Sequence, residues 1–228
     1  LRAHLKDDVE FNAEPRNLES LIDERFMDNF SMDFLIAHFN GNGGFLRKGF
    51  IFLPTVYQLC AEVGDFDTTD TIVRAAIHAC FTAQKSTGQF RLNGILVPLL
   101  RGMHWTLGMI SFARRRIEYF DSLQAQFVAG TVHQMLHQTA AKVRRLVSGL
   151  PSIGGSVVHR SREWNGGHRQ GTVNGRRVVT SGSCGSVVVR AAELLVYRNN
   201  LSGETYAYNR YHRMRQMAII ASYAAKRQ

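Results

Sequence analysis

The pattern of apolar and polar positions predicts a largely helical first third of the chain. A short apolar segment at 50–54 interrupts it. We expect Asn17, Ser31 and either Thr68 or Thr69 to cap helices, because their side-chain oxygens accept free backbone N–H groups. Apolar residues recur every three or four positions, as in helices with one buried face, over 17–30, 32–39, 55–63 and 67–84.

β-strands are predicted in the middle of the chain. Residues 94–100 form a continuous apolar run, which is typical of a central strand. Pro98 should end or distort this strand, because proline cannot donate a ladder hydrogen bond. Two further strands follow at 104–112 and 116–121, and the three residues 113–115 between them predict a tight hairpin.

The last part of the chain returns to helices. No linker is long enough to split the chain, so the pattern predicts a single α+β domain over 1–228. Gly149 should end the first of the remaining helices. The expected elements are a helix at about 125–147, β-like pieces at 157–158 and 178–179, a buried helix at 186–197, and a basic C-terminal helix at about 204–226.

Composition agrees with a globular domain. Of 228 residues, 45% are hydrophobic and 20% are charged, as in ordinary soluble proteins. No apolar run approaches the roughly 18 residues that a membrane span needs, so we expect no membrane partner. The chain begins with Leu1 rather than Met, and we interpret it as part of a longer protein.

The three cysteines have no disulfide-framework spacing, and their number is odd. We therefore expect reduced thiols in a reducing compartment, the cytoplasm or nucleus, including that of a host cell. Cys60 and Cys80 lie in apolar helical segments, as buried cysteines commonly do. Cys184 differs, because it follows a glycine-serine turn and precedes a helix.

Positive charge is concentrated in the C-terminal part. The net charge of the whole chain is +10, but residues 141–228 hold fifteen Lys and Arg against three acidic residues. This half is suited to an acidic protein surface or to a nucleic acid. The alternative is a solvated basic face that only aids solubility.

His104, Asp121 and Cys184 form a candidate catalytic set. Thiol catalysis needs a thiolate, a base that forms it, and a group that orients the base. His104 begins one predicted hairpin strand and Asp121 ends the next, so the hairpin should bring them together. A helix N-terminus favours the thiolate of Cys184, and the Cys184 backbone N–H can stabilise an oxyanion.

The same residues carry a resemblance to a known family. The segment 98–123 resembles the core of the ubiquitin-like-protein-specific (SUMO-specific) cysteine proteases, which share a clan with the adenovirus-type endopeptidases. The family order is His, Asp, Cys, with Trp105 after the His and Gly185 after the Cys. The resemblance covers about residues 20–200 as the core and implies a papain-like or adenain-like α+β fold, with a central mixed sheet flanked by helices. It also implies cleavage after the C-terminal Gly-Gly of a ubiquitin-like modifier, without metal or cofactor.

The resemblance also implies substrate-binding residues. The segment 30–36 is similar to the family's Trp-Leu-Asn-Asp segment beside the substrate channel, which marks Phe30 and Asp33. Trp105 and Gly185 would line a narrow tunnel for the Gly-Gly tail. Phe30 or Trp164 would form the opposite wall, unless Trp164 packs on the core.

One position departs from the family pattern. The family has a glutamine six residues before the cysteine, which donates to the oxyanion, and this chain has Val178 there. Gln170, Asn174 and Thr180 are the candidate replacements. Losing one oxyanion donor costs about 2.7–4 kcal/mol in the transition state.

Other functions stay open. A viral polyprotein-processing peptidase and a bacterial effector, either peptidase or acetyltransferase, belong to the same clan. A non-catalytic nucleic-acid-binding scaffold would explain Val178 and the basic half. His133 and His137 have metal-ligand spacing on a helix, but Gln134 replaces the glutamate of a metalloprotease and no third ligand is evident.

Overall fold

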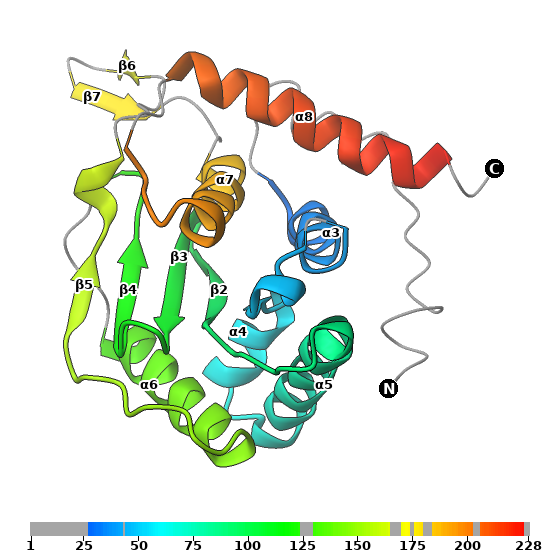
Figure 1. The fold of residues 1–228 in the computed structure, drawn as a ribbon. Helices are drawn as coiled ribbons and strands as arrows, with labels where there is room; N and C mark the ends of the chain where they lie inside the picture. Colours follow the sequence, from blue (N-terminus) through cyan, green and yellow to red (C-terminus); the bar gives the residue numbers. More distant parts are fainter. Residues whose placement is uncertain are drawn as a thin grey trace.

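A mixed five-stranded sheet with helices on both faces forms the centre of the computed structural model (Figure 1). The structure describes residues 27–42, 44–123, 130–164, 170–173, 176–179, 184–202 and 206–225. The strand order is β1-β2-β3-β4-β5, and β6 and β7 form a separate two-stranded sheet. This is the predicted α+β class.

The central strands form an antiparallel meander, and the outer strands run parallel to their neighbours. The hairpin between β3 and β4 turns at Arg115, whose φ of 55° is left-handed. The predicted apolar segment at 50–54 contains β1. The strands are β1 (Phe50–Phe52), β2 (Gly94–Arg101), β3 (His104–Ser111), β4 (Arg116–Phe120), β5 (Val157–His159), β6 (Gln170–Val173) and β7 (Arg176–Val179).

The helices in the described residues largely follow the apolar pattern. The predictions at 32–39, 55–63, 67–84, 186–197 and 204–226 are confirmed within a few residues. Residues 17–26 and 124–129 lie outside the described part, so the predicted helix with Asn17 as its cap and the start of the helix at 125 fall there. The helices are α3 (Asn29–Asn40), α4 (Val56–Glu62), α5 (Phe66–Gln84), α6 (Gly130–Leu146), α7 (Cys184–Tyr197) and α8 (Tyr206–Ala225), with short 3₁₀ turns η1 (Leu46–Lys48), η2 (Lys85–Thr87) and η3 (Ser161–Glu163).

Two apolar cores cover the two faces of the sheet. One core joins α3, α7 and α8 to the sheet face that carries Trp105, Leu107 and Met109 of β3. The other core joins α5 and α6 to the face that carries Ile110 of β3. Side chains alternate across a strand, so consecutive residues of β3 serve different cores. Within the described residues, no helix is both long and apolar enough to cross a membrane.

Two predicted helix caps are wrong. Asp28, not Ser31, caps α3, and its Oδ1 accepts the Ser31 N–H at 2.7 Å. Asp65, not Thr68 or Thr69, caps α5 and accepts the Thr68 N–H at 3.0 Å. In both helices an aspartate three residues earlier provides a charged acceptor for the first-turn amide, so the helix begins before the predicted hydroxyl cap.

Pro98 does not end β2 as predicted. The strand runs through Pro98 and pairs it with Leu107. The neighbouring Leu100 directs its N–H and C=O away from β3 to the side chain of Gln58, at 2.6 and 3.0 Å. Pro98 lies two residues before Leu100, so its backbone faces the same side, away from β3. Its missing N–H therefore faces the side where β1 has already ended at Phe52. No ladder hydrogen bond to β3 is lost.

Gly49 precedes β1 at a point where the backbone packs tightly. Its φ is 74°, and an added Cβ would collide with the carbonyl oxygen of Arg91. Gly88 has a similar φ of 69° but nothing within 4 Å of an added Cβ. Alanine at position 88 would therefore introduce backbone strain alone, whereas alanine at position 49 would introduce the same strain and a steric overlap.

We expect Gly88→Ala to lower the free energy of unfolding by about 1–2 kcal/mol, through left-handed strain alone. Gly49→Ala should lower it by about 1–3 kcal/mol more, because the Arg91 backbone must also shift. Urea denaturation of the two variants and the wild type measures both values. Equal losses would contradict this account of Gly49.

Candidate active site

The β3–β4 hairpin brings His104 and Asp121 together. The last paired residues are Leu107 and Phe120. Continuing this register places Asp121 opposite Thr106, so His104 is its diagonal neighbour on the same face rather than directly opposite. The His104 Nε2 and Asp121 Oδ1 atoms are 2.7 Å apart. The predicted pairing of these two side chains is present, with a two-residue offset.

Asp121 is buried and held by two further hydrogen bonds. Its Oδ1 accepts the Leu123 N–H at 2.8 Å, as in an Asx turn. Its own backbone N–H donates to the Ser161 hydroxyl oxygen at 2.9 Å. The Asp121 carboxylate is thus held by the backbone that follows β4. The Asp121 backbone is held by Ser161, forty residues later.

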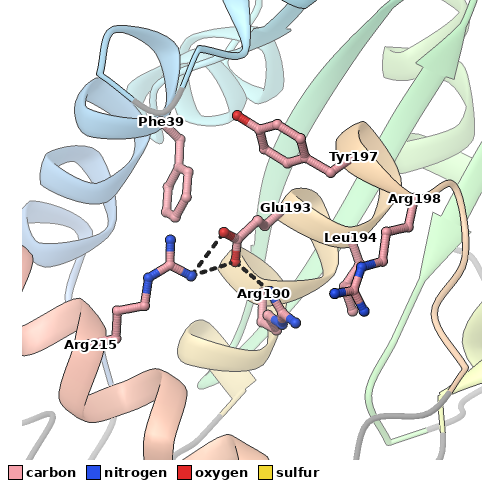
Figure 2. A pocket seen from close by; sticks show the side chains of 7 residues that line it. All are labelled: Phe39, Arg190, Glu193, Leu194, Tyr197, Arg198 and Arg215. Carbon is pink, nitrogen blue, oxygen red and sulfur yellow. Dashed lines mark hydrogen bonds and ion pairs between the residues drawn. The ribbon is translucent and has the colours of Figure 1, made fainter.

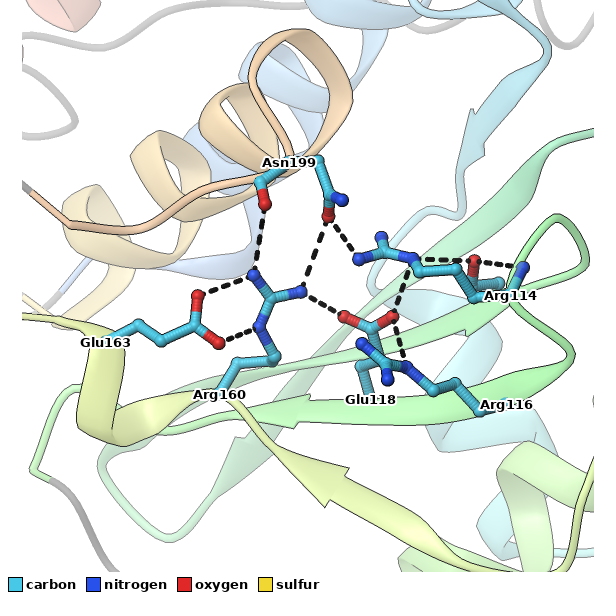
Figure 3. A network of polar contacts seen from close by, with 7 residues as sticks. Arg114, Arg116, Glu118, Arg160, Glu163 and Asn199 are labelled. Atoms are coloured by element: carbon cyan, nitrogen blue, oxygen red, sulfur yellow. Dashed lines mark hydrogen bonds and ion pairs between the residues drawn. The ribbon is translucent and has the colours of Figure 1, made fainter.

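A buried ionic network holds the segment that carries Ser161 (Figure 3). The Arg160 guanidinium donates to the carboxylates of Glu118 and Glu163, each at 2.5 Å, and to the Asn199 carbonyl at 3.2 Å. Glu118 is only 1% exposed, and a buried carboxylate needs such partners. Arg114 and Arg116 complete the network, each 3.1 Å from Glu118.

Sequence reasoning missed Ser161. Its hydroxyl has no motif around it and becomes meaningful only when β5 pairs beside β4. The nearest signal was Arg160 and Glu163, an i,i+3 charge pair beside Trp164. That pair predicts a local ion pair but not contact with Asp121.

Cys184 is the first residue of α7 and is 5% exposed. The Trp105 N–H donates to its sulfur at 3.4 Å, and the Met103 carbonyl oxygen lies 3.9 Å from it. The helix N-terminus and this N–H donor both direct partial positive charge toward the sulfur. The helix start also leaves the Cys184 backbone N–H without an intrahelical acceptor.

Gly185 lets the start of α7 approach the sheet. An added Cβ would lie 2.7 Å from the Met27 Cβ and 3.1 Å from Trp105 Cδ1. Both distances are shorter than ordinary contacts, so a larger residue would push Cys184 away from β3. Gly185 thus packs between Met27 and Trp105.

The charge state of His104 follows from its neighbours. Burial lowers the pKa of His104, but hydrogen bonds and charges from Asp121 and Cys184 outweigh it and raise the pKa to about 9. Because Nε2 contacts Asp121, Nδ1 is the nitrogen available to the thiol. His104 is therefore favoured in its imidazolium form, with Asp121 at one ring nitrogen and Cys184 nearby.

Both tryptophans of the predicted tunnel are buried. Trp105 is 1% exposed, and its Nε1 donates to the Met27 carbonyl at 2.7 Å. Trp164 is also 1% exposed and packs edge-on against Phe120, with ring centroids 5.5 Å apart. Trp164 is thus a core residue, which was the alternative interpretation of its sequence setting.

Phe30 and Asp33 lie on α3. Phe30 is half-buried against Phe34, with ring centroids 5.9 Å apart. The Asp33 carboxylate accepts the Thr55 N–H at 2.7 Å and the Thr55 hydroxyl at 2.8 Å. Burial raises the pKa of Asp33, while these hydrogen bonds lower it by less. Asp33 holds the turn before α4.

Of the three oxyanion candidates, the structure describes Gln170, the first residue of β6. Asn174 and Thr180 fall outside the described residues. Gln170 pairs with Val179, next to Val178, which occupies the family's glutamine position. The backbone register thus places Gln170 beside the expected donor position.

The two helical histidines contact each other. The Nε2 atoms of His133 and His137 are 2.8 Å apart on α6, and the Gly155 carbonyl lies 3.1 Å from His133. In the described part of the chain, no group of three or more His, Cys, Asp or Glu side chains is placed to hold a metal ion.

The fold is that of known SUMO protease catalytic domains. The SUMO protease Ulp1, with its catalytic cysteine oxidised to a sulfinic acid, matches with a TM-score of 0.62 and 14% identity, over 97% of this chain and 92% of that one. The Ulp1 protease domain in complex with Smt3, the yeast ortholog of SUMO, matches with a TM-score of 0.58 and 16% identity, over 90% and 81% of the two chains.

A third structure, the Ulp1-like SUMO protease catalytic domain of Chaetomium thermophilum, matches with a TM-score of 0.52 and 14% identity, over 86% and 72% of the chains. No protein-family model and no curated protein matches the sequence. The resemblance read from residues 98–123 is thus confirmed at the level of the fold.

The raised pKa of His104 links stability to pH. Folding favours the imidazolium, so its contribution is fully present below the ordinary pKa of 6.5 and is lost as pH rises through about 9. We expect the unfolding free energy to fall between pH 6.5 and 9 more steeply in wild type than in His104→Gln. Urea denaturation across this range tests the difference, and parallel pH profiles would contradict it.

Proposed function

We propose that this protein is a cysteine peptidase that cleaves after the C-terminal Gly-Gly of a ubiquitin-like modifier. The observation that carries the proposal is the junction of Asp121, His104 and Cys184, where the hairpin end meets the N-terminus of α7. These are the three roles that thiol hydrolysis requires.

The mechanism follows from the positions of the atoms. The Cys184 sulfur attacks the scissile carbonyl carbon, and a C–S bond forms. The Cys184 N–H stabilises the oxyanion, and the His104 imidazolium gives its proton to the leaving amine as the C–N bond breaks. His104 then takes a proton from water, which attacks the thioester carbonyl and releases the carboxylate and the thiol. Asp121 keeps Nε2 occupied throughout.

The narrow approach to the thiol supports a glycine substrate. Cys184 is 5% exposed and lies beneath the backbone of Met103 and Trp105. A chain without side chains can bring its carbonyl into such a site, whereas a larger residue would need the walls to open. Exposed Met103 and Leu123, 73% and 42% exposed, flank His104 and Asp121 and provide apolar contacts for the rest of the substrate.

The fold likeness supports the modifier class, since one solved relative is bound to Smt3, the yeast ortholog of SUMO. We propose a modifier conjugate or precursor as the substrate, in a reducing compartment where Cys184 remains a thiol. In this proposal Trp105, Phe30 and Gly185 shape the walls around the Gly-Gly tail, and Asp33 acts indirectly by holding the turn before α4 through Thr55. Of these, Trp105 and Gly185 lie next to the thiol.

Labelling with modifier probes tests the function. We expect a vinyl sulfone of SUMO or ubiquitin to form an adduct with the wild type and with Cys60→Ala, but not with Cys184→Ala. Hydrolysis of a C-terminal fluorogenic modifier should fall by about 10⁴-fold or more in Cys184→Ala. Cys60 is the matched control, because it is a half-buried thiol on α4 outside the site.

No adduct with any modifier, together with cleavage of a polyprotein precursor, would overturn the modifier substrate and favour the polyprotein-processing alternative. Transfer of acetyl groups to proteins through Cys184 would favour the effector acetyltransferase. Salt-sensitive nucleic-acid binding as the sole activity, unchanged in Cys184→Ala, would favour the scaffold.

The missing glutamine predicts that a different side chain completes the oxyanion site. We expect Ala substitution at one of Gln170, Asn174 and Thr180 to lower kcat by about 10²–10³-fold with little change in KM. Steady-state kinetics on the three single variants identify it. If all three retain wild-type kcat, the backbone N–H groups alone stabilise the oxyanion.

A further inference from the structure

A cavity lies away from His104, Asp121 and Cys184, where α3, α7 and α8 meet (Figure 2). Its volume is about 360 Å³, within the range of small-molecule sites. It shares α7 with Cys184, but Glu193 lies nine residues further along, about 14 Å away at 1.5 Å per residue. The lining residues are Phe39, Arg190, Glu193, Leu194, Tyr197, Arg198 and Arg215.

The charge of this cavity is unbalanced. Three guanidinium groups face one carboxylate, which leaves a formal charge of +2 among the lining residues. Glu193 accepts from Arg190 Nη1 at 2.6 Å and from Arg215 Nη1 at 2.8 and 3.0 Å. A guanidinium has five N–H donors, and Arg215 contacts Glu193 through Nη1, so this carboxylate engages only part of the Arg215 group.

Arg198 adds a charge that Glu193 does not neutralise. Within the part of the chain that the structure describes, no ion pair joins Arg198 to a carboxylate. Two more cations border the cavity at Tyr197. Lys48 Nζ lies 4.9 Å from the Tyr197 ring centroid, and the charge of Arg47 acts on the Tyr197 hydroxyl.

We propose that this cavity binds a small polyphosphate anion, such as pyrophosphate or the phosphate chain of a larger metabolite. The planar guanidinium fork matches phosphate oxygens in pairs. A charge of +2 calls for a ligand with two or more negative charges, and the volume of about 360 Å³ between three helices calls for a small one. In this proposal, part of the positive charge of residues 141–228 serves to bind a specific anion rather than to attract acidic surfaces in general.

Such a ligand would fasten α8 to the rest of the fold. Arg215 comes from α8, and the other arginines of the cavity come from α7 or its C-terminal end. Among the described residues, polar links between the two helices include Arg215 to Glu193 and Gln216 Nε2 to the Ser186 carbonyl, at 3.1 Å. The anion adds a bridge between the same helices, so binding should raise stability.

Calorimetry with pyrophosphate tests this site without any reference to peptidase activity. At constant ionic strength, pyrophosphate at 100 times its Kd should raise Tm by roughly 5–10 °C, whereas potassium chloride should not. Arg198→Gln should raise the Kd by about tenfold or more, through loss of a charged hydrogen bond. Since no ion pair in the described residues depends on Arg198, this variant should fold normally.

Arg145→Gln is the matched control, because it removes the same charge from an exposed position on α6. We expect its pyrophosphate affinity to equal that of the wild type. Absence of a Tm rise beyond the salt control would overturn the proposal. So would an equal loss of affinity in Arg145→Gln and Arg198→Gln, since binding would then be a general effect of net charge.

Discussion

The contact between the Cys184 sulfur and the backbone of Trp105 is the joint on which the site depends. At this point the N-terminus of α7 meets the first residues of β3, and a backbone N–H donates to the sulfur at 3.4 Å. The approach is possible because Gly185 presents no side chain to Met27 and Trp105. The Trp105 indole, which donates to the Met27 carbonyl at 2.7 Å, packs against Gly185. A side chain at position 185 would push the start of α7 away from β3, and this would move the Cys184 thiol away from His104.

The orienting carboxylate depends on a different part of the fold. Asp121 follows β4, but the hydroxyl that accepts its N–H belongs to Ser161 in η3. Arg160 holds that turn against the buried Glu118. Removing one partner of a buried ion pair typically costs 3–5 kcal/mol, so this network is a rigid support. Sheet geometry therefore positions His104, and the buried charges of Glu118 and Arg160 support the segment that holds Asp121.

Much of this could be read from the sequence. The apolar periodicity located the helices, and the short turn at Arg115 fixed the hairpin that joins His104 to Asp121. Pro98 was misjudged, since its effect depends on which neighbour its nitrogen faces, and β1 is too short to reach it. Ser161 was invisible because its role arises from pairing between distant segments. The cavity at Arg215 was equally hidden, since three separate helices form it.

We propose that Asp121 and His104 activate the side chain of Cys184 as a nucleophile. The alkylation rate of Cys184 by iodoacetamide at pH 6, followed by mass spectrometry of the peptide that contains it, tests this most directly. The account predicts rapid modification in the wild type and a rate lower by about tenfold or more in Asp121→Asn, because the imidazolium partner is lost. Equal rates in the two proteins would contradict it.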